Sequence, residues 1–322
     1  MANGADIEIT PQFVGPREPA PRGATPFRWE RKALAVHAWL VYLFLYLPIG
    51  VLIVFSFNEA RQTARWEGFT VHWYQKLAGN QLILKSVKNS LLVAGVTTVV
   101  ATVIGTLAAL AMGRFHFRGK AATQAALFLP IIIPEIVLGA ALVTFFGVTF
   151  DQLNDFMSAG HLRSFLSSLG CGADTVQAVA DYRFRLGIGT VIIAHVAFSI
   201  SYVAIVVRAR LAGFDRSLEE AAMDLGAGPL ATFFRVTLPL ILPGIVAGAL
   251  LVFTISIDDY VITSFVAGVG ATTLPMQIYS MIKTNVTPEV NAVSTLLLVF
   301  TVIMIAVAQR LQQPPETQGE KR

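Results

Sequence analysis

Three carboxylates lie in or beside long apolar stretches of this sequence, where charged side chains are rare. Glu135 interrupts the stretch 121–150, and Asp258 and Asp259 follow the stretch 236–257. A charged group inside a membrane helix is costly and tends to mark a solute pathway. Because all three side chains are acidic, the pathway that they indicate suits a cationic solute, whose ammonium groups need a carboxylate partner in a narrow cavity.

The elements that must position these acids are long apolar runs. Hydrophobic residues make up 55% of the 322 residues and charged residues only 14%, whereas a soluble domain is about half apolar and about a quarter charged. Roughly 20 helical residues cross the hydrocarbon core of a bilayer. Six runs are long enough, at 33–58, 89–113, 121–150, 186–207, 236–257 and 290–309. We therefore predict an all-α polytopic membrane protein with six transmembrane helices, at about 34–57, 89–112, 122–147, 187–208, 239–265 and 291–310.

Helical geometry separates the two aspartates. Neighbours on a helix point about 100° apart, so Asp258 and Asp259 cannot share a face. Asp259 aligns with Ser256 and Thr263, three and four residues away, in a polar stripe on an apolar helix. We expect Asp259 to face the pathway, whereas Asp258 fits equally the pathway, a subunit contact or a helix cap. Tyr260 is a candidate for a cation–π contact with the solute, although aromatic side chains in membrane helices more often contact lipid.

Two prolines precede the third acid. Pro130 and Pro134 each remove a backbone donor and are expected to kink or unwind the helix beside Glu135. At about 1.5 Å per residue, Glu135 lies roughly 20 Å from the cytoplasmic end of its helix, a little past the middle of the bilayer. Irregular backbone beside a carboxylate at this depth is typical of a translocation cavity.

The distribution of positive charge indicates the side of each connecting segment. Six crossings place both termini on one side, where four segments hold 15 of the 24 Lys and Arg residues: 1–32, 114–120, 208–235 and 310–322. Since basic residues accumulate in cytoplasmic segments, we expect the proline-rich tail 1–32 and the tail 311–322 to be cytoplasmic. The segment 148–186 is then an external insert. The net charge of +4 thus reports orientation and not a nucleic-acid partner.

The sequence carries no catalytic motif. A GxxxxGK[ST] loop is absent, because Arg114 stands where its first glycine would be relative to Gly119 and Lys120. The single cysteine, Cys171, can neither close a disulfide within the chain nor supply a thiolate metal cluster. His195, a lone histidine in an apolar run, is expected to pack or form hydrogen bonds. We therefore expect no catalytic residue, metal or cofactor in this chain.

The most informative polar segment is 213–236, between the fourth and fifth predicted helices. Ser217 and Glu220 have the spacing of a capping box, which predicts a short helix from Ser217 through Leu225. A turn containing glycine and proline at 226–229 ends that helix, and a second amphipathic piece follows. Periodicity alone fits two interpretations equally: a helix that docks on another protein, and an interfacial helix capped by its own glutamate.

The pattern in this segment resembles the EAA motif of binding-protein-dependent ABC importer permeases. Seven positions match, with valine where isoleucine is common: Glu220, Ala221, Ala222, Gly226, Val236, Leu238 and Pro239. In that family the segment forms a cytoplasmic coupling helix that docks into a cleft of the ATPase subunit. The resemblance implies that this chain couples to a cytoplasmic ATPase dimer through Glu220, Ala221, Ala222, Gly226, Leu238 and Pro239, and that the partner binds the ATP.

Other stretches resemble the spermidine/putrescine permeases within this family. They lie at 66–74, 89–91, 129–139, 256–259 and 274–281, and the stretch 286–292 points to the C-type subunit. The resemblance covers about residues 33–310 and leaves out the tail 1–32 and the segment 148–187. It implies a bacterial inner-membrane subunit that works beside a second, B-type permease. The cargo would be a polyamine delivered by an external polyamine-binding protein, and the pathway residues would be Glu135, Asp258, Asp259 and Tyr260.

Two alternatives remain at this stage. The same architecture could import another small solute, such as an opine, an aminophosphonate or ferric ion. An ATP-independent channel or carrier is a different class of protein, which the EAA-like segment disfavours. A membrane-embedded enzyme would need a paired catalytic constellation, which the sequence does not contain.

Overall fold

The structure is a computed structural model that describes residues 28–60, 65–158, 160–170, 172–284 and 287–312. Among these residues the regular structure is helical, apart from a single bridge between Asn58 and Phe69. Contacts divide the chain into two units, Met1–Val51 and Leu52–Arg322. The first unit contains most of helix α1 (Arg28–Phe55).

Six helical segments among the described residues are long and apolar enough to cross a membrane. They are α1, α3 (Gln81–Arg114), α5 (Glu135–Ser158), α8 (Ile188–Ala212), the run Pro229–Asp258 and α14 (Pro288–Gln312). The run Pro229–Asp258 joins α10 (Pro229–Thr232), the π-helical turn η1 (Phe233–Thr237) and α11 (Leu238–Asp258). The prediction of an all-helical protein with six transmembrane helices is therefore confirmed.

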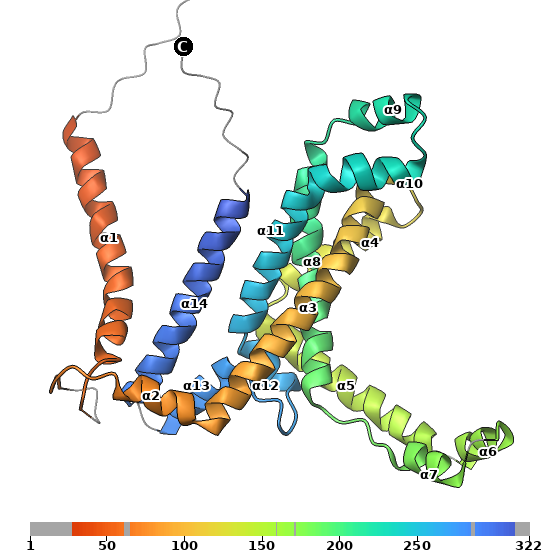
Figure 1. The fold of residues 1–322 in the computed structure, drawn as a ribbon, viewed down its shortest axis with the longest axis horizontal. Helices are drawn as coiled ribbons and strands as arrows, with labels where there is room; N and C mark the ends of the chain where they lie inside the picture. The colour runs from red at the N-terminus through yellow and green to blue at the C-terminus, as the bar shows by residue number, and fades with distance from the viewer. Residues whose placement is uncertain (1–27, 61–64, 159, 171, 285–286, 313–322) are drawn as a thin grey trace, which may run out of the picture. The chain divides into compact units, whose positions relative to one another are not determined.

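The second unit is built around α3, α8 and α11, which pack against one another (Figure 1). Gly105 on α3 lies so close to α8 that a Cβ atom there would stand 2.7 Å from the Cβ of Val203. Gly248 on α11 contacts the same valine, which is fully buried between the two glycines. Membrane helices pack through such small residues because lipid supplies no hydrophobic driving force for their association. The three helices form a close-packed frame for the elements around them.

The third apolar run forms two helices instead of one. α4 (Lys120–Ile132) is followed by an extended residue, Ile133, and α5 begins at Glu135. Pro134 has no N–H to donate and disfavours helical backbone at the residue before it, so the helix stops at Ile133. Pro130 remains inside α4. The irregular backbone that the sequence predicts beside Glu135 is therefore present at Pro134, whereas Pro130 does not interrupt its helix.

The fifth apolar run ends before the expected residue 265. α11 ends at Asp258, two non-helical residues follow, and α12 (Val261–Val266) begins. The carboxylate of Asp259 accepts the backbone N–H groups of Ile262 and Thr263, at 3.3 and 2.8 Å. These donors at the start of a helix would otherwise lack a partner. Asp259 therefore stabilises the break that divides the predicted helix.

Short helices gather at opposite ends of the second unit (Figure 1). α9 (Ser217–Asp224) lies at one end with α10, whereas α2 (His72–Gly79), α12 and α13 (Leu274–Thr284) lie at the other. α6 (Gly160–Ser168) and α7 (Ala173–Asp181) also lie at this second end. They occupy the segment that the sequence identifies as an external insert, and α5 itself continues into that segment as far as Ser158.

Candidate solute pathway and coupling segment

A cavity of about 430 Å³ lies beside the end of α11, between α13 and α14. Its apolar wall includes Ile278, Ile282, Leu297 and Leu298, and its polar groups are Asp258, Tyr260, Tyr279, Ser294 and Thr301. The Thr301 hydroxyl is buried and has no hydrogen-bond partner within the described part of the chain. The volume is typical of small-molecule sites, which span roughly 300–1,000 Å³. One carboxylate with hydroxyls and an apolar wall suits a small organic cation.

Two tyrosines stand beside Asp258 in this cavity. The ring centroids of Tyr260 and Tyr279 are 4.4 Å apart, and the rings are tilted by 40°. The Lys283 ammonium lies 4.7 Å from the centroid of the Tyr279 ring. This distance allows a cation–π interaction. The Lys283 ammonium therefore occupies one face of the Tyr279 ring.

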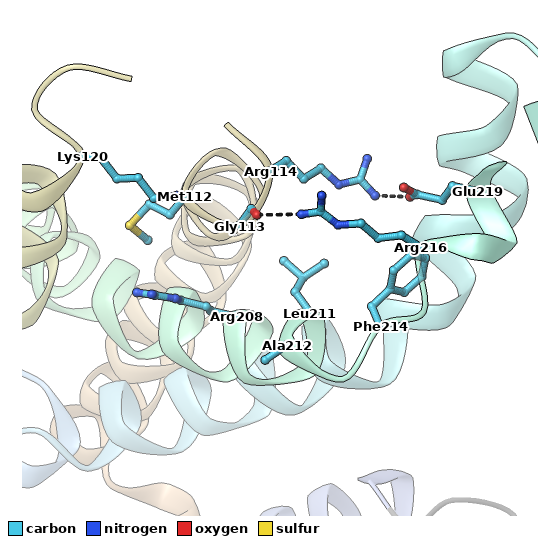
Figure 2. A pocket seen from close by; sticks show the side chains of 10 residues that line it. All are labelled: Met112, Gly113, Arg114, Lys120, Arg208, Leu211, Ala212, Phe214, Arg216 and Glu219. Carbon is cyan, nitrogen blue, oxygen red and sulfur yellow. Dashed lines mark hydrogen bonds and ion pairs between the residues drawn. The ribbon is translucent and has the colours of Figure 1, made fainter. Parts of the chain in front are cut away.

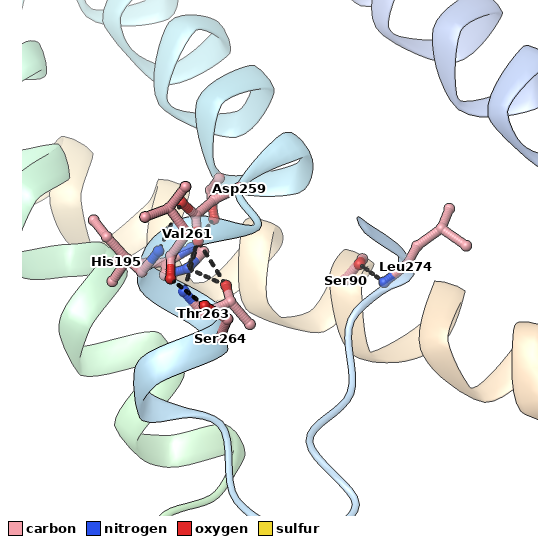
Figure 3. Close-up of polar contacts among 9 residues, drawn as sticks. Ser90, His195, Asp259, Val261, Thr263, Ser264 and Leu274 are labelled. Atoms are coloured by element: carbon pink, nitrogen blue, oxygen red, sulfur yellow. Dashed lines mark hydrogen bonds and ion pairs between the residues drawn. The ribbon is translucent and has the colours of Figure 1, made fainter. Parts of the chain in front are cut away.

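The frame helix α3 positions the segment that leads into α13. The Asn89 side-chain amide donates to the carbonyl oxygens of Gly270 and Thr272, at 3.0 and 2.9 Å. The Ser90 hydroxyl accepts the backbone N–H of Leu274 at 2.8 Å (Figure 3). These bonds explain the structural role of the Asn89–Ser90 pair and connect Tyr279 and its helix to the core.

Asp259 lies in a buried hydrogen-bond network and not in the cavity (Figure 3). Its carboxylate accepts the Thr263 hydroxyl at 2.7 Å and lies 3.2 Å from Nε2 of His195. Nδ1 of His195 is 2.7 Å from the Ser256 hydroxyl, and Nε2 is 2.9 Å from the Thr263 hydroxyl. The side chains of His195 and Asp259 are 0% and 6% exposed. The network therefore joins α8, α11 and α12 inside the bundle.

The structure places Asp258 in the cavity and Asp259, the aspartate expected to face the pathway, inside the bundle. The polar stripe of Ser256, Asp259 and Thr263 exists, but it faces His195 on α8. The reason is that α11 ends between the two aspartates, so the helical spacing used to orient them does not continue. Asp258 lines the cavity with Tyr260. His195 forms hydrogen bonds, as expected of a lone histidine in an apolar run.

The buried network gives the first testable prediction. Replacing Asp259 by alanine should lower the free energy of unfolding by about 2–3 kcal/mol, because the backbone N–H groups of Ile262 and Thr263 and the Thr263 hydroxyl would lose their carboxylate acceptor. Thermal unfolding of the purified chain in detergent measures this loss. Asp258→Ala is the matched control and should leave the midpoint nearly unchanged, since its side chain is exposed in the cavity. Equal losses from both variants would contradict the assignment.

Glu135 lies apart from this cavity. It occupies the first turn of α5, where the partial positive charge of a helix N-terminus favours a carboxylate. Its side chain is exposed and, within the described residues, forms no hydrogen bond or ion pair. The structure does not bring Glu135 together with Asp258 or Asp259. An exposed acid on a membrane-length helix requires cover from water or from another subunit.

We call residues 213–236 the coupling segment. Within it Glu219, and not the Glu220 of the EAA-like pattern, contacts the rest of the protein. Glu219 pairs with Arg114 at the end of α3 and also accepts the Thr237 hydroxyl. Glu220 is exposed and unpaired among the described residues. The side chain of Glu219 therefore anchors α9 to two other elements and leaves Glu220 free. The one sign of this ion pair in the sequence is the basic loop 114–120, whose first residue is Arg114.

The expected capping box does not form. The helix begins at Ser217 as predicted, but Ser217 is its first residue, and its backbone N–H donates to the Asp215 carboxylate at 2.9 Å. Glu220 does not reach back to the helix start. The hydrogen bond from Ser217 lowers the pKa of the Asp215 carboxyl. The N-cap position itself is Arg216, whose side chain forms no capping hydrogen bond, and Asp215 satisfies the first N–H of the helix.

Gly226 ends α9 in a backbone conformation that other residues rarely adopt. Its φ angle is +88°. The Gly226 N–H donates to the Met223 carbonyl at 2.9 Å, and the Ala227 N–H donates to the Ala222 carbonyl at 3.1 Å. This pair of bonds is a Schellman motif, which satisfies the last carbonyls of a helix and needs a left-handed residue. The glycine of the EAA-like pattern is therefore required by geometry.

Part of the exposed surface of the coupling segment is apolar. Five of its large side chains are solvent-exposed: Leu218, Met223, Leu225, Leu230 and Phe234. Leu225, at the end of α9, is 91% exposed. Ala221 is exposed beside this surface and Ala222 is half-buried, while Leu238 and Pro239 begin α11. Clustered apolar side chains on the surface mark interaction sites.

At the opposite end, one buried acid holds two helices together. Glu289 on α14 binds the Lys76 ammonium at 2.5 Å and the Asn80 amide at 3.3 Å. Trp73 is buried, and its indole N–H donates to the Asn58 carbonyl at 2.7 Å. The sequence stretches 66–74 and 286–292 thus contain residues that stabilise the fold.

Residues 101–313 match the family described as "Binding-protein-dependent transport system inner membrane component". The spermidine/putrescine transport system permease protein PotC of Haemophilus influenzae is 36% identical over 271 residues, which cover 84% of this chain and 93% of the relative. The putrescine transport system permease protein PotI of Escherichia coli K12 is 39% identical over 260 residues, covering 80% and 83%.

Solved structures show the same fold at low sequence identity. A bacterial ABC transporter involved in the import of the acidic polysaccharide alginate has a chain with a TM-score of 0.66 and 18% identity. That similarity covers 88% of this chain and 95% of the other. The two chains therefore share a fold.

Proposed function

Because this chain belongs to the family of binding-protein-dependent transport system inner membrane components, we propose that it is a permease subunit of an ATP-driven importer whose cargo is a polyamine. It is a multi-pass inner-membrane protein. The observation that carries the cargo assignment is the Asp258 cavity with its two tyrosines. The names of the relatives, which describe spermidine and putrescine permeases, agree with this chemistry.

The cavity matches the two chemical features of a polyamine. An ammonium group near pH 7 carries a charge that needs a carboxylate partner, and Asp258 supplies it. The faces of Tyr260 and Tyr279 add a cation–π surface. The methylene chain between ammonium groups can contact the apolar wall at Ile278 and Leu297. Glu135 provides a second carboxylate along the pathway, away from this cavity.

The coupling segment is the proposed contact with a cytoplasmic ATPase dimer. Its exposed apolar side chains provide the docking surface, with Glu220 and Ala221 beside it. Glu219 and Arg114 would carry the motion of the ATPase from α9 into α3. On this proposal the end that bears α9 is cytoplasmic, both termini lie on that side, and ATP is bound by the partner alone.

Two further partners complete the importer. A second, B-type permease would cover the exposed apolar faces of this chain and contribute to the pathway. An external polyamine-binding protein would deliver the cargo at the end that bears α2 and α13. High affinity then resides in the binding protein, and the Asp258 cavity needs only a moderate affinity that permits release.

Reconstitution tests the proposed function. The chain, the second permease and the ATPase dimer are inserted together into liposomes, and labelled putrescine is presented on its binding protein. We expect uptake that requires ATP and all the subunits. Uptake by this chain alone, without ATP, would favour a self-sufficient channel or carrier and contradict the proposal.

The lysine over Tyr279 gives a second prediction. Lys283 competes with the cargo for the ring face, so Lys283→Met should lower the KM for the putrescine-loaded binding protein about two- to fivefold, the equivalent of one exposed cation–π contact. The measurement is initial uptake rate against the concentration of loaded binding protein. Lys85→Met, an exposed lysine on α3, is the control and should leave KM unchanged. A rise in KM for Lys283→Met would show that this ammonium assists binding.

A further inference from the structure

A second cavity, of about 590 Å³, opens where the ends of α3 and α8 meet the start of α4 and the approach to α9 (Figure 2). Four basic residues line it: Arg114, Lys120, Arg208 and Arg216. Glu219 is the single acid among its lining residues. The proposed transport function uses this acid and Arg114 and assigns no role to the other three cations.

Three of the four positive charges in this cavity have no acidic partner among the described residues. Glu219 is already paired with Arg114 and bonded to Thr237. Among the described residues the other three cations meet neutral groups only. Lys120 donates to the Phe115 carbonyl at 3.1 Å and Arg216 to the Gly113 carbonyl at 3.4 Å (Figure 2), while Arg208 faces the side-chain amide of Gln124. Basic side chains that converge without acids form a site for an anion.

The position of the cavity indicates where the anion comes from. Arg114 is the last residue of α3, Lys120 is the first of α4, and Arg208 lies near the end of α8. The cavity therefore opens at the level where membrane-length helices leave the bilayer. Its lining also includes apolar side chains, Met112, Leu211 and Phe214. Basic pockets between transmembrane helices at this level suit lipid headgroups.

We propose that this cavity binds the phosphate group of an anionic phospholipid from the surrounding membrane. The phosphate lies among Lys120, Arg208 and Arg216, and the acyl chains leave along the apolar side. The lipid thereby connects the ends of α4 and α8 to the segment before α9. The proposal is independent of the cargo assignment.

Lipid titration of the purified importer tests the proposal. Native mass spectrometry gives the dissociation constant of the first palmitoyl-oleoyl phosphatidylglycerol molecule, and phosphatidylcholine serves as the uncharged reference. Lys120→Gln with Arg208→Gln should weaken phosphatidylglycerol binding about 30-fold, since each basic group contributes about fivefold. Phosphatidylcholine binding should not change. Equal affinity of the unaltered importer for the two lipids would overturn the proposal.

The matched control removes the same number of positive charges, two, from positions near Lys120 and Arg208 that lie outside the cavity. Arg118→Gln with Arg210→Gln changes the loop before α4 and the end of α8, but neither side chain lines the cavity. This variant should retain phosphatidylglycerol affinity within about twofold, and a 30-fold loss would overturn the proposal by showing a nonspecific charge effect.

A single variant and a competition with inorganic phosphate complete the test. If the double variant fails to assemble, Lys120→Gln alone should lose about fivefold. This half-buried lysine bonds only to the Phe115 carbonyl among the described residues, so its replacement should leave the fold intact. No loss of affinity would overturn the proposal. Inorganic phosphate should not displace the lipid at equal concentration. Displacement would assign the cavity to a soluble phosphate compound and overturn the lipid assignment.

Discussion

Replacing Asp258 by asparagine in the assembled importer should lower kcat/KM for putrescine uptake by about 10- to 100-fold. The variant keeps the shape of the side chain and loses its charge. A hydrogen bond to a charged group contributes about 1.5–3 kcal/mol, which corresponds to this factor. The measurement is ATP-dependent uptake of labelled putrescine into proteoliposomes, with the amount of inserted protein checked for each variant.

The control for this prediction is Asp174→Asn. Asp174 is an exposed acid in the first turn of α7, outside the cavity, and its loss should leave uptake unchanged. The same pair of variants distinguishes the cargo classes. An anionic cargo such as an aminophosphonate would be transported as well or better after Asp258→Asn, because an acid in its path repels it. Unchanged putrescine uptake would remove Asp258 from the pathway.

Replacing Gly226 by proline should abolish uptake and transport-coupled ATP hydrolysis. Proline fixes φ near −65°, whereas the residue at this position has a φ angle of +88°. It also removes the N–H that donates to Met223. Together these changes cost about 3 kcal/mol or more, enough to unfold the end of α9 and displace Leu225. The measurement is cargo-stimulated ATPase activity of the reconstituted importer.

Two companion variants separate local geometry from docking. Gly226→Asn should keep most of the activity, because asparagine tolerates the left-handed conformation better than other residues. Glu220→Lys leaves the fold of α9 intact, since Glu220 has no partner among the described residues. It should nevertheless reduce coupling if Glu220 contacts the ATPase. Normal coupling in Gly226→Pro and Glu220→Lys together would refute the docking role of this segment.

Much of the architecture could be predicted because it depends on local sequence. Apolar runs of membrane length identified six spanning helices, and the EAA-like pattern identified the family, which the comparison confirms. Pro134 marked the break before Glu135, since the backbone restriction of proline is local. The glycine that ends α9 was also evident, because Gly226 meets a geometric requirement few residues can satisfy.

The details of the site depend on tertiary contacts and could not be derived. The orientation of Asp258 and Asp259 was inferred from a helix that ends between them, and the side chain of Asp259 is held by His195 on another helix. Tyr279 reaches the cavity only because Asn89 and Ser90 hold the preceding segment against α3. The anchor of α9 is Glu219, which pairs with Arg114 on another helix, and no local pattern distinguishes it from Glu220.

The central claim is that the cavity beside Asp258 is part of the solute pathway. Cysteine labelling tests it most directly, in a background that lacks the single native cysteine, Cys171. Ser294→Cys places a thiol in the cavity, and Ser280→Cys places one on α13 outside it. We expect a small cationic thiol reagent to modify Ser294→Cys in the working importer, and putrescine-loaded binding protein to slow that modification without affecting Ser280→Cys. Modification of Ser294→Cys at the same rate with and without putrescine would contradict the claim.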